Sequence, residues 1–151
     1  MNINVRLTFD EIDVNDIVKK CIHPSGGAVT TFVGTTREYF EDDDMKKDVT
    51  LLSYEAADEL ALLEMNDICE DALQKYGGLK ASIVHRLGEV KVEEISIVCC
   101  ISTPHRKEGF EACEWMMKDL KKRVAVWKKE IFTDGTSLWK ENIENDLKYN
   151  L

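Results

Sequence analysis

The sequence predicts an α+β fold built as one domain. Strand-like apolar segments and helical segments follow one another without the strict alternation of strand and helix that is typical of α/β proteins. The 151 residues suit one domain, and no repeat or linker divides them. With 44% hydrophobic and 32% charged residues, 2 Pro and 8 Gly, the composition excludes disordered and fibrous proteins. We therefore expect a single domain over 1–151, with a polar tail from about residue 141.

The first part of the chain is predicted to begin with a strand and a short helix. Alternating apolar and polar residues over 3–9 have the period of a half-buried strand, and Asp13 is a good N-cap for a helix at 14–21. The run AVTTFVG at 28–34 is typical of a more fully buried strand. We expect a surface loop at 38–48, where an acidic run and a basic pair occur without an apolar period.

The second part is predicted to be richer in strands. A strand at 49–55 leads into a long helix at 57–76, and Gly77-Gly78 provides the C-terminal stop. The segments expected after this stop are strands at 80–86, 89–92 and 94–103, a helix at 107–123, a strand at 125–132 and a hairpin turn at Asp134-Gly135. The apolar stripe of helix 107–123 predicts core positions for Phe110, Cys113, Met117 and Leu120.

Basic residues gather in one part of an acidic chain. The segment from His105 to Lys129 contains eight Lys and Arg against four Asp and Glu, net +4, whereas the rest of the chain is −13 and the whole is −9. A cationic segment in an acidic protein indicates a specific anionic ligand. The overall charge disfavours nucleic acid as that ligand.

The start of helix 107–123 is one candidate site for the anion. Pro104 ends the preceding strand, and His105 and Arg106 follow where the helix dipole and free N–H groups attract a phosphate or a carboxylate. Arg106 offers two parallel N–H donors, and His105 can titrate near neutral pH. Lys121 lies about 22 Å further along the same helix, at 1.5 Å per residue. A single pocket would therefore need another chain or a folded-back strand to close the gap.

The basic candidates also have structural interpretations. Basic residues at Lys121 and the two positions after it are common in the last turn of a helix, where they offset its dipole. Lys128 is less expected in a strand beside Val126 and Trp127. Crowding by other cations disfavours the ammonium form of a lysine, which then can act as a nucleophile or base. We expect His85 to be a half-buried strand residue bonded to the backbone.

No common catalytic motif or metal-binding pattern is present. The five cysteines contain no CxxC pair, so we expect buried thiols, with Cys99 and Cys100 on opposite faces of one strand. P-loop, GxGxxG, HExxH, GxSxG and EF-hand patterns are absent from the sequence, and we expect neither a metal nor a resident cofactor. Because no apolar run approaches ~20 residues and the N-terminus lacks a signal-peptide core, we expect the cytosol.

Five segments in order resemble the large, catalytic subunit of molybdopterin synthase, the MoaE family. They are FVGTTR at 32–37, LSYEA at 52–56, HRLGEV at 85–90, SIVCCISTPHR at 96–106 and LKKRVAVWKKE at 120–130. The resemblance covers about residues 1–140 and implies an α/β-hammerhead fold with an additional small antiparallel sheet. It also implies a homodimer of large subunits within a heterotetramer, in which each binds a small ubiquitin-like, MoaD-like sulfur-carrier subunit.

The resemblance further implies a sulfurtransferase. The small subunit's Gly-Gly C-terminus, as a thiocarboxylate, would enter a pocket and give two sulfurs to cyclic pyranopterin monophosphate, forming the dithiolene of molybdopterin. The family's pocket residues fall on Arg37, His105, Arg106, Lys121 and Lys128. The first three are expected to bind phosphate and pterin, with His105 as a proton carrier. Lys121 would be the leading catalytic amine and Lys128 its supporting cation or acid and base.

Two positions depart from the family pattern. Ala125 stands where the family often has Pro, which predicts a less rigid turn between helix and strand. The family can also contribute a basic residue across the dimer, and after Trp139 the candidates here are Lys140 and Lys148. A rival hypothesis is a non-catalytic module that binds the ubiquitin-like tail or a phosphorylated pterin. Retention of both Lys121 and Lys128 favours the enzyme.

Overall fold

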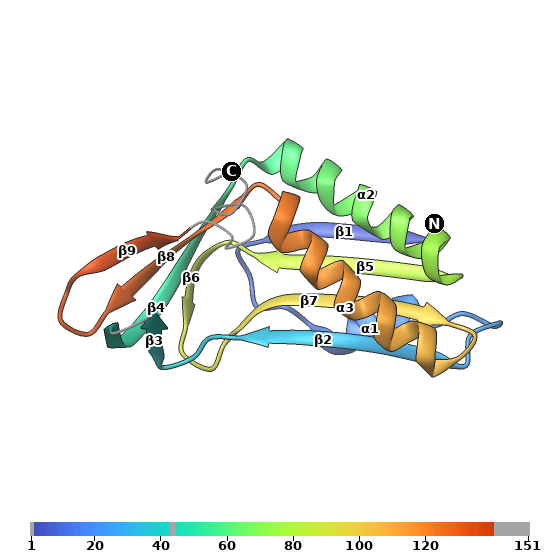
Figure 1. Cartoon of the computed structure of the whole chain (residues 1–151), viewed down its shortest axis with the longest axis horizontal. Helices are drawn as coiled ribbons and strands as arrows, with labels where there is room; N and C mark the ends of the chain where they lie inside the picture. Colours follow the sequence, from blue (N-terminus) through green and yellow to red (C-terminus); the bar gives the residue numbers. More distant parts are fainter. Residues whose placement is uncertain (1, 43–44, 141–151) are drawn as a thin grey trace.

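A computed structural model describes residues 2–42 and 45–140. One of its two sheets has four strands in the order β1-β5-β7-β2 (Figure 1). These strands are β1 (Ile3–Thr8), β5 (Lys80–Arg86), β7 (Ile95–Thr103) and β2 (Ala28–Thr35). β1 runs parallel to β5, whereas β7 is antiparallel to both of its neighbours. β2 is therefore an edge strand of this sheet.

Helices cover both faces of the four-stranded sheet. α2 (Asp58–Tyr76) and α3 (Arg106–Arg123) lie on one face, and the short α1 (Val14–Cys21) lies on the other (Figure 1). Cys99 belongs to the core under α2 and α3, and Cys100 to the core under α1. The prediction that these adjacent cysteines face opposite sides of the sheet is confirmed.

Local sequence signals set the helix ends. The Asp13 side chain accepts a hydrogen bond from the Asp16 backbone N–H at 3.1 Å, which caps α1 as predicted. α2 ends at Gly77, whose φ of 64° is left-handed and suits glycine. α3 lies close to the sheet because Gly109 faces Thr30, and a β-carbon on Gly109 would overlap the Thr30 hydroxyl. These contacts hold the first turn of α3 against β2.

A second sheet, of five strands, forms the other end of the molecule (Figure 1). Its strands are β3 (Tyr39–Asp42), β4 (Met45–Ala56), β8 (Val126–Phe132) and β9 (Ser137–Lys140), with β6 (Gly88–Lys91) paired to β4. Gly135, with φ of 87°, makes the predicted turn between β8 and β9. The end of β4 and the start of β8 pair beside α2 and α3, where Ala56 is opposite Val126, and both strands extend from there to the pair Val49 and Phe132.

The prediction of a surface loop at 38–48 is wrong. β3 and the start of β4 form an antiparallel hairpin there, in which Tyr39 pairs with Asp48 and Phe40 with Lys47. Phe40 is buried, and its ring centroid lies 5.9 Å from that of Phe132. The charges concealed the strands because this short hairpin gains its apolar contacts from β8, a segment distant in sequence.

Some predicted burial is also wrong. β2 is an edge strand, so Phe32 and Val33 remain 42% and 38% exposed instead of buried. Phe110 is 64% exposed, although its stripe neighbours Cys113 and Leu120 are in the core. Three exposed apolar side chains thus lie along β2 and the first half of α3. The predicted tail from residue 141 falls outside the described residues.

The turn after α3 is more firmly held than Ala125 suggested. The Ala125 N–H donates to the Glu64 carboxylate at 3.0 Å, and its carbonyl accepts from the Ala57 N–H at 3.1 Å. These two bonds tie the turn to the start of α2 without a proline. None of the helices in the described part of the chain has the length and apolar character needed to cross a membrane.

Candidate active site

A cavity of about 290 Å³ lies where the two sheets meet the C-terminal end of α3. Residues from β2, β4, β5, β7, α3 and β8 contribute to its wall. Phe32, Ile97, Met117 and Leu120 supply apolar surface. The cavity thus combines apolar walls with side chains delivered by elements far apart in sequence, as small-molecule sites commonly do.

Three cations converge on this cavity. Arg37 follows the end of β2, Lys121 lies in the last turn of α3, and Lys128 lies in the middle of β8. The Arg37 guanidinium is 5.2 Å from the centroid of the Tyr39 ring, a cation–π contact that orients the arginine. Arg37 and Lys121 are exposed and Lys128 is half-buried. All three can therefore meet an anion that enters from solvent.

A buried carboxylate accompanies the lysine of β8. Glu130 is 6% exposed, and its Oε1 lies 3.6 Å from the Lys128 Nζ. The other oxygen, Oε2, is buried without a hydrogen-bond partner among the described residues. Glu130 also lines the cavity, so its free oxygen is available to a ligand donor or to a bound water. The pairing holds the Lys128 ammonium beside the cavity.

Uncharged polar groups occupy another part of the wall. His85 is 5% exposed, and its Nδ1 lies 2.8 Å from the Arg86 carbonyl oxygen. Its ring meets that of Tyr54 edge to face, with centroids 4.8 Å apart. Burial lowers the pKa of His85 from 6.5 to about 4, and burial raises the pKa of Tyr54. Both rings are thus uncharged near neutral pH.

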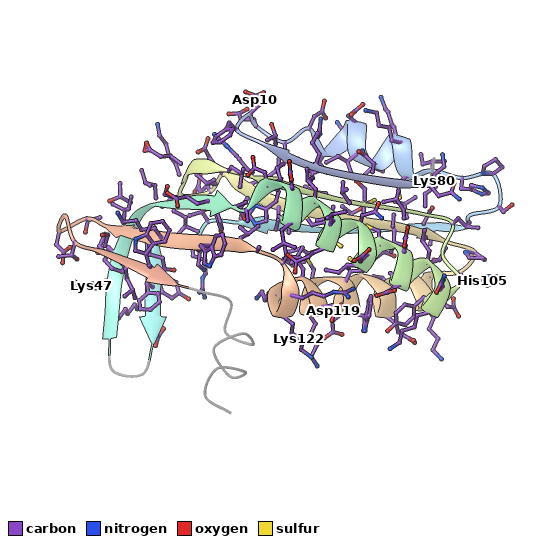
Figure 2. The ribbon with its side chains drawn as sticks, turned by 90° about the horizontal axis from the view of Figure 1, so that it is seen from above. Asp10, Lys47, Lys80, His105, Asp119 and Lys122 are labelled. Atoms are coloured by element: carbon purple, nitrogen blue, oxygen red, sulfur yellow. The ribbon has the colours of Figure 1, made fainter. Side chains whose placement is uncertain are left out.

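His105 and Arg106 do not line this cavity. Figure 2 shows His105 at the end of α3 opposite Lys122, and both predicted residues are exposed. His105 is the N-cap residue of α3, and the Thr103 hydroxyl donates to its carbonyl oxygen at 2.6 Å. The helix therefore separates these two residues from Lys121 by about 22 Å within one copy of the chain.

Two other basic residues of the cationic segment make contacts outside the cavity. Lys129 faces away from the cavity, with its Nζ 5.5 Å from the Trp139 ring centroid. Arg123 forms ion pairs with Asp71 and Asp119 at 2.9 and 2.8 Å. Alternation along β8 explains why Lys128 and Lys129 point to opposite faces. The predicted structural role of a basic helix end therefore applies to Arg123.

Sequence reasoning did not select Tyr54, Ser96 or Glu130 for the site. Tyr54 pairs with Lys128 across β4 and β8, so their side chains share a face of the five-stranded sheet. Residues two apart in a strand point to the same face, so choosing Lys128 for the site also indicated Glu130, two positions further along β8. Ser96 had no such signal, because its position depends on the pairing of β7 with β2.

The cysteines do not provide a nucleophile for this cavity. All five are free and buried, as predicted. Burial raises the pKa of Cys69 to about 12, and the Cys113 contact and burial raise the pKa of Cys99 well above its ordinary value. Over residues 2–42 and 45–140, no group of three or more His, Cys, Asp or Glu side chains is placed to hold a metal ion.

The mixed α+β fold is shared with known proteins. The structure of molybdopterin synthase from Staphylococcus aureus matches with a TM-score of 0.81 and 30% identity, over 89% of this chain and 94% of that one. A complex of subunits 1 and 2 of molybdopterin-converting factor from Helicobacter pylori 26695 contains a chain with the same fold, at a TM-score of 0.71 and 20% identity, over 92% of this chain and 91% of that one.

Sequence comparison places the chain more narrowly. The molybdopterin synthase catalytic subunit of Culex quinquefasciatus is 48% identical over 143 residues, which are 93% of this chain and 88% of that protein. The corresponding subunit of Taeniopygia guttata is 40% identical over 141 residues, with 93% and 88% covered. A family model described as MoaE protein matches residues 7–123. The chain belongs to the MoaE family.

Family membership confirms the main predictions from the sequence. The α+β fold of the hammerhead type is confirmed by the similarity to solved MoaE structures. The assignment to molybdopterin synthase is confirmed by the curated catalytic subunits that share nearly the whole chain. The chain therefore has an enzyme role in molybdopterin biosynthesis. Its site residues remain a prediction.

Proposed function

We propose that this chain transfers sulfur as the large subunit of a molybdopterin synthase. The thiocarboxylated C-terminus of a small ubiquitin-like subunit would give its sulfur to cyclic pyranopterin monophosphate, and two such transfers would form the dithiolene. Each transfer adds one sulfur to the pterin and returns one thiocarboxylate to a carboxylate. The observation that carries this proposal is the convergence of Arg37, Lys121 and Lys128 on one cavity.

The charges of the reactants explain the three cations. The substrate carries an anionic cyclic phosphate ester, and the sulfur donor is itself an anion, so bringing them together in water is unfavourable. Preorganised cations offset that repulsion and stabilise the anionic intermediates of the transfer. In this scheme Lys121 is the catalytic amine beside the reacting carbon, Lys128 is its supporting cation, and Arg37 binds the substrate anion. Glu130 keeps Lys128 in place through the 3.6 Å ion pair.

The sulfur donor is proposed to be a separate subunit. The similar Helicobacter pylori chain was solved in a complex of subunits 1 and 2 of molybdopterin-converting factor, which supports a two-subunit enzyme. Lys121 and Arg37 are both exposed at the cavity, so an extended peptide tail can reach them from solvent. A Gly-Gly terminus suits this approach because it has no side chains to clash with the walls.

We also assign His105 and Arg106 to the site, but in a second copy of the chain. One copy leaves them about 22 Å from Lys121 at the opposite end of α3. β2 supplies a surface for dimerisation: it is an edge strand, it contains neither proline nor a charged residue, and Phe32 and Val33 are exposed along it. Such an edge is a ready template for pairing with another strand.

A two-fold axis between the β2 strands of two copies would bring His105 and Arg106 of one copy towards the cavity of the other. β2 starts at Ala28, which pairs with Thr103 just before His105, and it ends at Thr35 just before Arg37. Antiparallel pairing of two β2 strands places the start of one beside the end of the other. His105 and Arg106 of the second copy would then lie near the first copy's Arg37. The exposed Phe110 of α3 would lie at the same interface.

The assembly that follows is a heterotetramer, with two large subunits in contact and one small subunit at each cavity. Lys140 and Lys148 remain candidates for a further basic residue across the dimer; Lys148 lies outside the described residues. We propose that the enzyme works in the cytosol, where its five free thiols would stay reduced.

The test is reconstitution from this chain, a thiocarboxylated small subunit and cyclic pyranopterin monophosphate, followed by mass spectrometry of the pterin. Lys121→Ala should lower the rate of sulfur gain by on the order of 100-fold while small-subunit binding persists. Lys122→Ala is the matched control, one residue further along α3, and should retain activity. Full activity of Lys121→Ala would contradict its catalytic role. Tight binding of the small subunit by the wild type without sulfur gain would favour the non-catalytic module.

A further inference from the structure

The three cations leave part of the proposed substrate without partners. Arg37, Lys121 and Lys128 are hydrogen-bond donors, and neither guanidinium nor ammonium groups can accept a hydrogen bond. A reduced pterin, by contrast, carries ring N–H and amino groups that donate. Burying such donors without acceptors would cost affinity. The cavity therefore needs acceptors at the place where the pterin binds.

The hydrogen bond of His85 determines which of its ring nitrogens can accept. The Arg86 carbonyl oxygen, 2.8 Å from Nδ1, can only accept, so Nδ1 carries the proton. In the neutral ring Nε2 then has a free lone pair. Because burial keeps the pKa of His85 at about 4, this tautomer persists at neutral pH even beside the cations of the cavity.

Packing fixes the direction of the ring. His85 lies on β5 between Leu7 of β1 and Ile97 of β7, so its backbone is held by strands on both sides. Tyr54 packs edge to face against the imidazole from β4, with ring centroids 4.8 Å apart. The imidazole is 95% buried and still forms part of the cavity wall. A side chain restrained from two sheets can select a ligand by geometry.

We propose that His85 is a specificity-determining residue of the cavity, whose Nε2 accepts a hydrogen bond from an N–H group of the pterin. This inference rests on the proposed function. It divides the substrate between two kinds of partner: the cations bind its phosphate, and His85 binds its heterocycle. Inorganic phosphate, which has no heterocycle, would need only the cations.

Two variants separate this role from a structural one. His85→Gln can place an amide oxygen near the position of Nε2, whereas His85→Asn places its amide near Nδ1 and reaches no further. The large subunit, with no small subunit present, is titrated calorimetrically with cyclic pyranopterin monophosphate and, separately, with inorganic phosphate. Leu7→Val is the matched control, because Leu7 flanks His85 on β1 but does not line the cavity.

We expect His85→Asn to raise the Kd for the pterin by about 10- to 100-fold, as loss of a buried acceptor does. His85→Gln should remain within about fivefold of the wild type, and Leu7→Val should have the affinity of the wild type. Phosphate affinity should be unchanged in all three. Equal pterin affinity of the Asn variant and the wild type would overturn the role of His85, as would equal losses in the Asn and Gln variants. A wild type that fails to bind the pterin would instead contradict the proposed function.

Discussion

The buried, neutral His85 makes a prediction about stability that does not depend on the substrate. Its imidazole has a pKa of about 4 in the folded protein, against 6.5 as the ordinary value. Below pH 6.5 the unfolded chain therefore binds a proton at this residue that the folded chain does not bind. Protonation stabilises the unfolded state, so stability falls as the pH drops from about 6.5 towards 4.

The size of this effect follows from the two pKa values. Between pH 7.5 and pH 5, His85 alone should lower the free energy of unfolding by about 2 kcal/mol, and the loss approaches about 3 kcal/mol near pH 4. His85→Gln removes the ionisation but keeps an uncharged polar side chain. Between pH 7.5 and pH 5, the free energy of unfolding of the Gln variant should therefore fall by about 2 kcal/mol less than that of the wild type.

The assay is urea unfolding of both proteins at pH 7.5 and pH 5, followed by circular dichroism. The Gln variant is expected to be less stable at pH 7.5, because it loses the bond to the Arg86 carbonyl. The difference between the two proteins should shrink by about 2 kcal/mol at pH 5. If it stays constant, His85 is not held neutral by burial, and the assignment of Nε2 as an acceptor loses its basis.

Two further predictions concern the contacts that position α3 and the second copy. Gly109→Ala should lower stability by about 1–2 kcal/mol, because overlap with the Thr30 hydroxyl outweighs the gain in helix propensity. Thr30→Ala in the same chain should recover most of the loss in urea unfolding, and a Gly109→Ala protein more stable than the wild type would contradict the contact. Val33→Lys should convert the proposed dimer to a monomer in light scattering, since an edge lysine blocks strand pairing. Leu63→Lys, at a 65% exposed position on α2, is its control, and a dimeric Val33→Lys protein would exclude β2 as the interface.

Signals carried by neighbouring residues were predictable from the sequence. The alternation of β1, the Asp13 cap, the Gly77 stop and the Asp134-Gly135 turn all depend on residues within a few positions of one another. Local chemistry alone specifies each of them. The predicted boundaries of these elements accordingly lie within a residue or two of the observed ones.

Features that depend on distant segments were not predictable in the same way. Phe40 is buried by Phe132, some ninety positions away in the chain, so the hairpin at β3 and β4 had no local apolar period. The exposure of Phe32 depends on β2 being last in the sheet order, which its apolar sequence does not reveal. The grouping of His85, Tyr54 and Glu130 around one cavity depends on how the two sheets meet.

Sulfur transfer is proposed to occur at a site assembled from two copies of the chain. This two-copy site is tested by mixing two variants that are expected to be inactive, Lys121→Ala and Arg106→Ala, and reassembling them as dimers. A mixed dimer would contain one intact site, with Lys121 from one copy and Arg106 from the other. Random reassembly should therefore restore about a quarter of the wild-type sulfur gain by the pterin. No recovery in demonstrated mixed dimers would contradict the account, because a site built within one copy stays broken in every combination.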